Sequence, residues 1–194
     1  IENIQKSLNR MNVSSIDLLQ FHWWDYNNPH YMDALKYLTD LRDTKMIKNI
    51  GLTNFDTERV QIMMDSDLPI VSNQIQYSII DRRPEVKMIP FCQKHHISIL
   101  AYGSLCGGLM SDHYFGRKKP SAAELDTLSL RKYYQMIEAW GGWNLFQELL
   151  SNLKTISQKH KVSIANVATR YILDRAAIAG VIIGTRLGIV EHRV

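Results

Sequence analysis

The sequence predicts an α/β fold in which parallel strands alternate with covering helices. Short runs of β-branched and other apolar residues recur along the chain, and most segments between them carry apolar residues at helical spacing. These strand runs are apolar throughout, which is typical of strands buried on both faces of a parallel sheet. Repeated strand–helix units of this kind form either an open doubly wound sheet or part of a closed barrel.

Bulk composition excludes several classes of protein. The 194 residues are enough for one domain with a substantial core, and the 45% apolar and 22% charged content is ordinary for a soluble protein. The net charge of +4 is small and scattered, so nucleic-acid and membrane-surface binding are not expected. Cys92 and Cys106 have no metal-ligand spacing and indicate a reducing compartment. No apolar run is long enough to cross a bilayer.

The first 44 residues are expected to contain two helices and a strand. Residues 1–11 carry their apolar side chains on one helical face. A buried strand is expected over Ile16–His22. Asn28 is a good helix cap and Pro29 suits the first helical position, so the second helix is expected to begin there and end near Thr44.

The middle of the chain continues the alternation. We expect, in order, strand Lys48–Asn54, helix Asp56–Asp65, strand Ile70–Gln76, helix Lys87–His96 and strand Ile97–Tyr102. Pro90 should lie in the first turn of its helix, because an interior proline would cost about 3 kcal/mol.

Residues 109–143 are the least regular stretch and are expected to form a long loop with short helical pieces. Their basic run Arg117-Lys118-Lys119 could clamp a bound anion or simply be solvated. A strong helix is then expected around 145–156, and Ser163 should cap another. Val181-Ile182-Ile183 is expected to be the last strand.

Suggestive side chains stand at the carboxyl ends of all five expected strands. They are His22, Asn54, Gln74, Tyr102 and Arg186. In a parallel barrel the chemistry sits at these ends, so we expect one shared site. The strand ending in Tyr102 opens into a loop of small residues, which suits a stacked flat ring followed by phosphates. Most glycine-rich loops are only turns, so this signal is weak by itself.

Five segments of the chain resemble the aldo-keto reductase superfamily, in the family's order and at its spacing. They are residues 15–22 (SIDLLQFH), 51–55 (GLTNF), 71–77 (VSNQIQY), 101–105 (AYGSL) and 182–186 (IIGTR). The resemblance implies a (β/α)8 TIM barrel, which needs about 250 residues. Residues 1–194 are therefore expected to form one incomplete barrel domain, truncated at the N-terminus and also at the C-terminus, with about five parallel strands that correspond to the family's strands four to eight.

The resemblance also implies an activity: reduction of an aldehyde or ketone by hydride transfer from NADPH, with a small-molecule carbonyl substrate. The family's catalytic set is Asp, Tyr, Lys and His. His22 matches the histidine that orients the carbonyl, and a neutral imidazole can donate to a carbonyl oxygen. The other three have no match here and are expected upstream, so activity of this chain alone is in doubt.

The cofactor residues are likewise implied by the resemblance. Thr53, Asn54 and Gln74 look like the group that binds the nicotinamide carboxamide, and Tyr102 looks like the aromatic that stacks on the ring. Gly103, Ser104, Leu105, Gly107 and Gly108 would pass around the pyrophosphate, although relatives often carry serine and proline at the first two of these positions. Gly184, Thr185 and Arg186 would bind the adenosine 2′-phosphate, which favours NADPH/NADP+. Each could instead be an ordinary cap or core residue.

Two other functions remain open. A barrel that lacks strands exposes sheet edges, so the chain could be a structural or regulatory subunit that a protein partner or an upstream segment covers. It could also be a small-molecule-binding domain with no redox role. Trp23, Trp24 and Trp143 could wall a substrate pocket or only pack. A cytoplasmic location is expected, although a missing N-terminus would also remove any targeting signal.

Overall fold

The structure is a computed structural model that describes residues 2–184. The chain divides into two compact units, one made of Ile1–Ile75 with Glu85–Leu100 and the other of Gln76–Pro84 with Ala101–Val194. Five parallel strands form one sheet in the order β1-β2-β3-β4-β5. The predicted α/β class and its parallel sheet are therefore confirmed.

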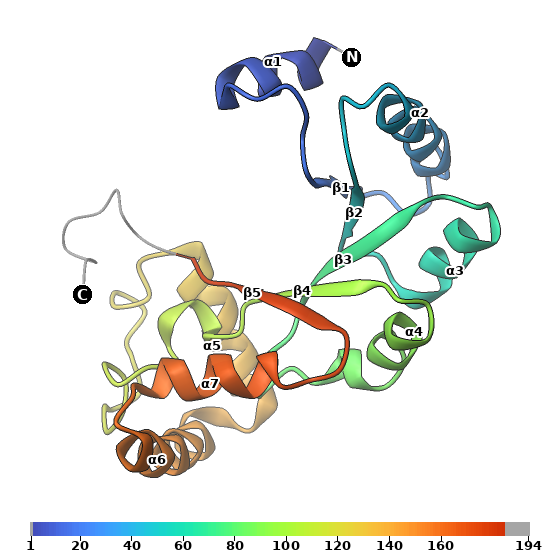
Figure 1. The fold of residues 1–194 in the computed structure, drawn as a ribbon. Coiled ribbons are helices and arrows are strands. Elements are labelled where there is room, and N and C mark those ends of the chain that lie inside the picture. Colours follow the sequence, from blue (N-terminus) through green and yellow to red (C-terminus); the bar gives the residue numbers. More distant parts are fainter. Residues whose placement is uncertain (1, 185–194) are drawn as a thin grey trace. The chain divides into compact units, whose positions relative to one another are not determined.

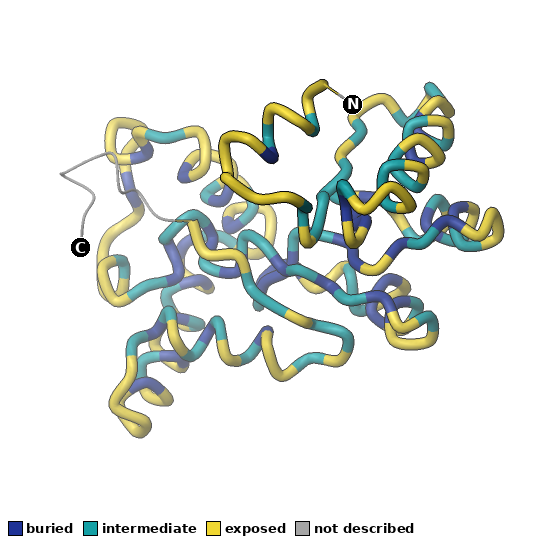
Figure 2. Tube along the Cα trace, turned by 45° about the horizontal axis from the view of Figure 1, so that its top comes forward, coloured by how far each residue is buried: buried dark blue, intermediate teal, exposed yellow. Residues whose placement is uncertain are grey.

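The first unit alternates strands and helices. Its elements are α1 (Glu2–Met11), β1 (Leu19–His22), α2 (Tyr31–Asp43), β2 (Ile50–Thr53), α3 (Thr57–Asp65), β3 (Ile70–Gln76), α4 (Met88–Lys94) and the start of β4 (Ser98–Tyr102). Helices α2, α3 and α4 lie on the same side of strands β1 to β3 (Figure 1). They cover β2, the middle one of these three strands, whose residues Ile50, Gly51 and Leu52 are all buried. Helix α1 is largely exposed, and only its Leu8 is buried (Figure 2).

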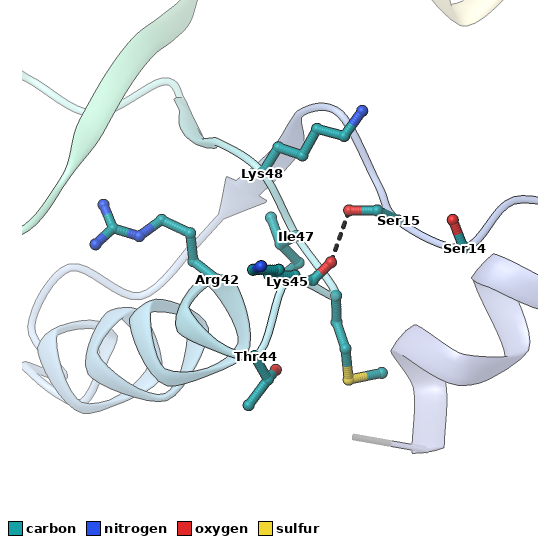
Figure 3. A pocket seen from close by; sticks show the side chains of 8 residues that line it. Ser14, Ser15, Arg42, Thr44, Lys45, Ile47 and Lys48 are labelled. Carbon is teal, nitrogen blue, oxygen red and sulfur yellow. Dashed lines mark hydrogen bonds between the residues drawn. The ribbon is translucent and has the colours of Figure 1, made fainter.

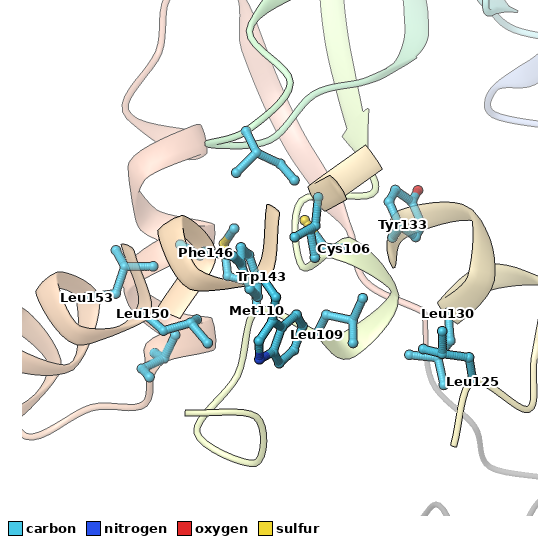
Figure 4. Packing of buried hydrophobic residues seen from close by; sticks show 14 residues of the cluster. Cys106, Leu109, Met110, Leu125, Leu130, Tyr133, Trp143, Phe146, Leu150 and Leu153 are labelled. Atoms are coloured by element: carbon cyan, nitrogen blue, oxygen red, sulfur yellow. The ribbon is translucent and has the colours of Figure 1, made fainter. Parts of the chain in front are cut away.

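The second unit has a mainly helical core. Its elements after β4 are the short 3₁₀ helix η2 (Cys106–Gly108), α5 (Leu128–Trp140), α6 (Gly142–His160), α7 (Ile164–Leu173) and β5 (Ile178–Ile182), and η1 (Arg83–Glu85) begins within its first segment. Buried side chains from η2, α5, α6 and α7 form one apolar cluster that includes Leu109, Met110, Leu130 and Phe146 (Figure 4). This cluster fixes α5 against the loop that follows β4.

The predicted element order is confirmed except at one place. Residues 109–143 were expected to be irregular, but α5 fills Leu128–Trp140 with three full turns. Thr127 caps it by accepting from the Leu130 N–H, and Leu130, Tyr133 and Ile137 are buried at helical spacing. The prediction of an irregular stretch was wrong. The basic run before the helix and the Gly141-Gly142 pair after it made the apolar spacing of α5 hard to recognise in the sequence.

The start of the second helix also differs from the prediction. Helix α2 begins at Tyr31, and its cap residue His30 makes no side-chain capping hydrogen bond. The Asn28 side chain instead accepts from the His30 N–H at 3.0 Å. Asn28 and Pro29 therefore form a turn before the helix, because the asparagine oxygen satisfies the nearest backbone donor.

Two further features match the expectations. Pro90 lies in the first turn of α4, and Ser163 caps α7 with a full capping box. No helix within the described residues is long and apolar enough to cross a membrane.

Candidate functional site

Three predicted site residues lie in one row, at the carboxyl ends of β1 and β2 and two residues before the end of β3. In the parallel pairing, His22 is the register partner of Thr53, and Thr53 is the register partner of Gln74. Residues in register on adjacent parallel strands point to the same face of the sheet. An imidazole, a hydroxyl and an amide therefore stand side by side, and all three can donate hydrogen bonds.

Asn54 is held directly beyond this row. Its backbone N–H donates to the Gln74 carbonyl at 2.9 Å, and the Tyr26 hydroxyl donates to the Asn54 carbonyl at 2.9 Å. The residue has a left-handed φ of 63°, which asparagine tolerates better than most residues. The next residue, Phe55, is buried, and its carbonyl accepts from the Asn73 side chain at 2.8 Å. The turn that presents Asn54 is thus anchored from both sides.

A second polar row lies two residues earlier on the same strands, and therefore on the same face. Gln20 is the register partner of Gly51, which in turn pairs with Ser72. The Gln20 amide atoms and the Ser72 hydroxyl are buried without a hydrogen-bond partner among the described residues. A Cβ at Gly51 would collide with both side chains, so glycine is required for them to approach.

The tryptophans near His22 have different surroundings. Trp24 is 82% exposed and its ring stands edge-on to the His22 ring at 4.5 Å. Trp23 donates its indole N–H to the carbonyls of Asp25 and Asn28, so it stabilises its own loop. Trp143, in the second unit, is buried and donates to the Arg117 carbonyl at 3.0 Å, which favours the packing interpretation for this residue.

In the second unit, the loop after β4 has a backbone suited to close approach. Gly103, Cys106, Gly107 and Gly108 all have positive φ, from 51° to 103°. Where right-handed and left-handed backbone conformations follow each other, successive N–H groups can form a concave surface that binds an anion. The Ser104 side chain is buried and donates to the Tyr77 carbonyl at 3.1 Å, while the Tyr77 N–H donates to the Tyr102 carbonyl at 3.0 Å. These bonds fix where the loop leaves the strand.

Helix α5 packs directly on this loop. A Cβ at Gly103 would lie 2.9 Å from Tyr133 Cζ, and one at Gly107 would lie 2.9 Å from the Ser129 hydroxyl oxygen. Two of the predicted pyrophosphate glycines are therefore required by helix packing. Gly108 differs, because no atom lies within 4 Å of a Cβ built there.

Buried polar groups surround the base of the loop. The Asp81 carboxylate is 2% exposed and accepts from Arg83 Nε at 2.7 Å and from Gln76 Nε2 at 2.7 Å. Burial raises the pKa of Asp81, but the hydrogen bonds from Arg83 and Gln76 outweigh it and hold this pKa below its ordinary value. Burial raises the pKa of the Cys106 thiol to about 12 and that of Tyr133 to about 12. Cys106 and Tyr133 are therefore neutral at physiological pH.

The remaining predicted residues lie at the end of the described chain. Gly184 follows β5 and is exposed. Thr185 and Arg186 lie outside the described residues. The structure thus brings together His22, Thr53, Asn54 and Gln74 in one unit and Tyr102 to Gly107 in the other. Convergence of all five strand ends on a single site stays a prediction.

Two surface cavities lie elsewhere. A pocket of about 780 Å³ is lined by residues that precede β1 and β2 and by the end of α2, including Arg42, Lys45 and Lys48 (Figure 3). Arg42 is paired with Asp43 and Lys48 with Asp17, so its positive charge is largely balanced. A second, mainly apolar groove of about 590 Å³ lies along α6 and α7. Neither contains a predicted site residue, and no metal-binding cluster occurs within residues 2–184.

Sequence inspection missed one group beside the loop. Lys132 and Tyr133 come from α5, the helix that was predicted as irregular chain. The Lys132 ammonium lies 5.6 Å from the centre of the Tyr102 ring and 5.0 Å from that of Tyr133. The capping residue Thr127 followed by apolar residues three, six and ten positions later was the signal that could have revealed this helix.

Comparison with known proteins places the chain in a family. A model of the Aldo/keto reductase family matches residues 1–187. The chain therefore belongs to the aldo/keto reductase family, and the predicted resemblance is confirmed.

Curated relatives are distant and longer. Flagellar radial spoke protein 5 of Chlamydomonas reinhardtii is 29% identical over 82% of this chain and 33% of its own length. Aldo-keto reductase YhdN of Bacillus subtilis is 27% identical over 90% of this chain and 51% of its own length. The chain thus spans a third to a half of these relatives.

Solved structures agree in fold. A glycerol dehydrogenase from Gluconobacter oxydans superimposes with a TM-score of 0.75 at 24% identity, over 93% of this chain and 53% of its own. An aldo/keto reductase from Klebsiella pneumoniae in complex with NADP and acetate gives a TM-score of 0.67 at 17% identity, over 93% of this chain and 53% of its own. A further relative, from Escherichia coli, is named NADH-specific methylglyoxal reductase. One of these two proteins thus holds NADP in its solved structure, and the other is named for NADH.

Proposed function

We propose that this chain is part of an NADPH-dependent oxidoreductase that reduces an aldehyde or ketone carbonyl. The observation that carries the proposal is the row of His22, Thr53 and Gln74 in register at the carboxyl ends of three adjacent parallel strands. Chemistry in parallel barrels is built at this edge. Membership of the aldo/keto reductase family supports carbonyl reduction as the reaction class.

The donor set fits a nicotinamide amide group. Thr53 offers a hydroxyl, and Asn54 and Gln74 offer amides that both donate and accept, as recognition of a carboxamide requires. Under the proposal the Tyr102 ring and the loop from Gly103 to Gly107 serve the same cofactor. When bound, the reduced nicotinamide supplies the hydride for the carbonyl carbon. Preference for NADPH rests on Arg186, whose guanidinium suits a phosphate.

His22 is assigned to the substrate. The imidazole at the strand end donates an N–H to the carbonyl oxygen, which orients the carbonyl and stabilises the charge that develops there. The exposed Trp24 ring beside it offers an apolar wall. The proton for the product alcohol comes, under this proposal, from a tyrosine outside residues 1–194.

A nucleotide titration tests this function. NADPH and NADH are titrated into the 194-residue chain and into the full product of the gene that encodes it, with tryptophan quenching and nucleotide fluorescence as signals. We expect saturable NADPH binding by the full product, weaker NADH binding, and about tenfold weaker NADPH binding in Gln74→Ala. Gln61→Ala is the matched control, because its amide bonds only to Asp65 on the surface of α3. Absence of NADPH binding by both folded proteins would overturn the proposal.

One observation favours a second candidate, a structural or regulatory subunit on a reductase scaffold. The 29% identical relative from Chlamydomonas is named for a flagellar radial spoke. This candidate predicts that the full product binds a protein partner and does not oxidise NADPH with any small aldehyde. An enzyme instead shows turnover that falls about a hundredfold in His22→Ala while NADPH affinity is kept.

A further inference from the structure

Helix α5 is placed to contribute to the loop that follows β4. Ser129 and Tyr133 of α5 contact the loop so closely that Gly103 and Gly107 have no room for a Cβ. Residue 132 lies between these two contact residues in the helix. Lys132 itself is exposed on the helix, beside these two contacts.

Lys132 brings a positive charge to this place. Its ammonium lies over both the Tyr102 and Tyr133 rings, at 5.6 Å and 5.0 Å from their centres. Within the part of the chain that the structure describes, Lys132 forms no ion pair. The neighbouring cations differ: Lys119 is paired with Glu138, and Arg83 is paired with Asp81. Lys132 is thus a charge close to the loop that no carboxylate balances.

We propose that Lys132 binds the pyrophosphate of the nicotinamide dinucleotide, which extends the proposed function to a residue of α5. A dinucleotide whose nicotinamide stacks on Tyr102 carries its pyrophosphate into the adjoining loop, where Gly108 leaves open space. The lysine ammonium on a flexible four-carbon stem can exchange a weak contact with aromatic faces for a stronger one with phosphate oxygens. Without the dinucleotide, the Lys132 ammonium rests against the Tyr102 and Tyr133 rings.

The test separates the pyrophosphate from the rest of the cofactor. The full product is titrated with NADPH, with ADP-ribose, which carries the pyrophosphate, and with 2′-AMP, which lacks it. We expect Lys132→Gln to bind NADPH and ADP-ribose about tenfold more weakly, with a smaller salt dependence, and to bind 2′-AMP as the wild type does. Lys132→Arg should stay within about threefold of wild type, because it keeps the charge.

Lys159→Gln is the matched control, since it removes the same charge from an exposed position near the end of α6. It should bind all three probes as the wild type does. Equal affinities of wild type and Lys132→Gln for ADP-ribose would overturn the inference and leave the proposed function standing. Equal weakening toward ADP-ribose and 2′-AMP would also overturn it, because it would indicate a general structural effect. Failure of the wild type to bind NADPH would instead overturn the proposed function itself.

Discussion

Both the backbone conformation and the side-chain packing at residue 103 require glycine. The residue has a φ of 72°, and a Cβ there would press on the Tyr133 ring. Gly103→Ala should therefore lower the free energy of unfolding by about 2–4 kcal/mol, the sum of left-handed strain and overpacking. Urea unfolding followed by circular dichroism measures this change.

Gly108→Ala is the control for that measurement. Its φ of 103° imposes strain, but no atom lies within 4 Å of the added Cβ. We expect a loss of about 1–2 kcal/mol from strain alone. Equal losses at both glycines would show that the approach of Tyr133 contributes nothing.

The two cysteines should be unreactive in the folded protein. Both are buried, and burial raises the pKa of Cys92 to about 12, as it does for Cys106. Because the thiolate is the reactive form, neither should be modified by a thiol reagent such as DTNB at pH 8 on the time scale of minutes. The same protein in urea should show two reactive thiols. A rapid reaction of the native protein would contradict the described burial.

At the scale of elements, the clearest local signal concerns α7. Ser163 accepts from the Asn166 N–H at 3.1 Å, and the Asn166 side chain accepts from the Ser163 N–H at 3.3 Å. Ser163→Ala removes the hydroxyl that accepts from the Asn166 N–H, and this should lower the free energy of unfolding by about 1 kcal/mol. Thermal unfolding measures the loss. Ser151→Ala, within α6 and exposed, serves as the control and should change little.

Local sequence signals succeeded where one interaction decides the structure and failed where several compete. Ser163 has one available role, and the prediction was right. Asn28 has two, and its side chain satisfies the His30 N–H in a turn instead of capping α2. Helix α5 was missed because charged and glycine-rich flanks obscured an apolar stripe, whose role becomes visible only through its packing on Phe146 and Leu109.

At the scale of the whole molecule, the parallel sheet followed from the apolar strands, and the row of His22, Thr53 and Gln74 followed from the sheet. Parallel strands align their carboxyl ends, so the expected strands predicted the places of His22 and Gln74, while Thr53 came from the family resemblance. Lys132 could not be found in this way. Its place depends on tertiary contacts of Tyr133 and Ser129 with glycines about 25 residues away in sequence, which no local pattern records.

Stability of the molecule should also depend on pH through Asp81. Its carboxylate is buried and accepts hydrogen bonds from the exposed Arg83 and from Gln76, and its pKa in the folded protein lies below its ordinary value. A depressed pKa means that the native state favours the ionised form more than the unfolded chain does. The resulting stabilisation is fully present above the unfolded value of about 3.9 and is lost as pH falls through the lower folded value.

Asp81→Asn should therefore lower stability at pH 7 by about 1–3 kcal/mol. The asparagine can still accept a hydrogen bond from Gln76, but it lacks the negative charge that strengthens the bonds from Gln76 and Arg83. The effect should shrink as pH falls below 4, since the wild type then becomes protonated while the variant does not change. Urea unfolding of both proteins between pH 3 and pH 7 measures the two curves. Parallel curves over this range would show that Asp81 titrates alike in the folded and unfolded chain, and the Arg83 pairing would then contribute nothing to the fold.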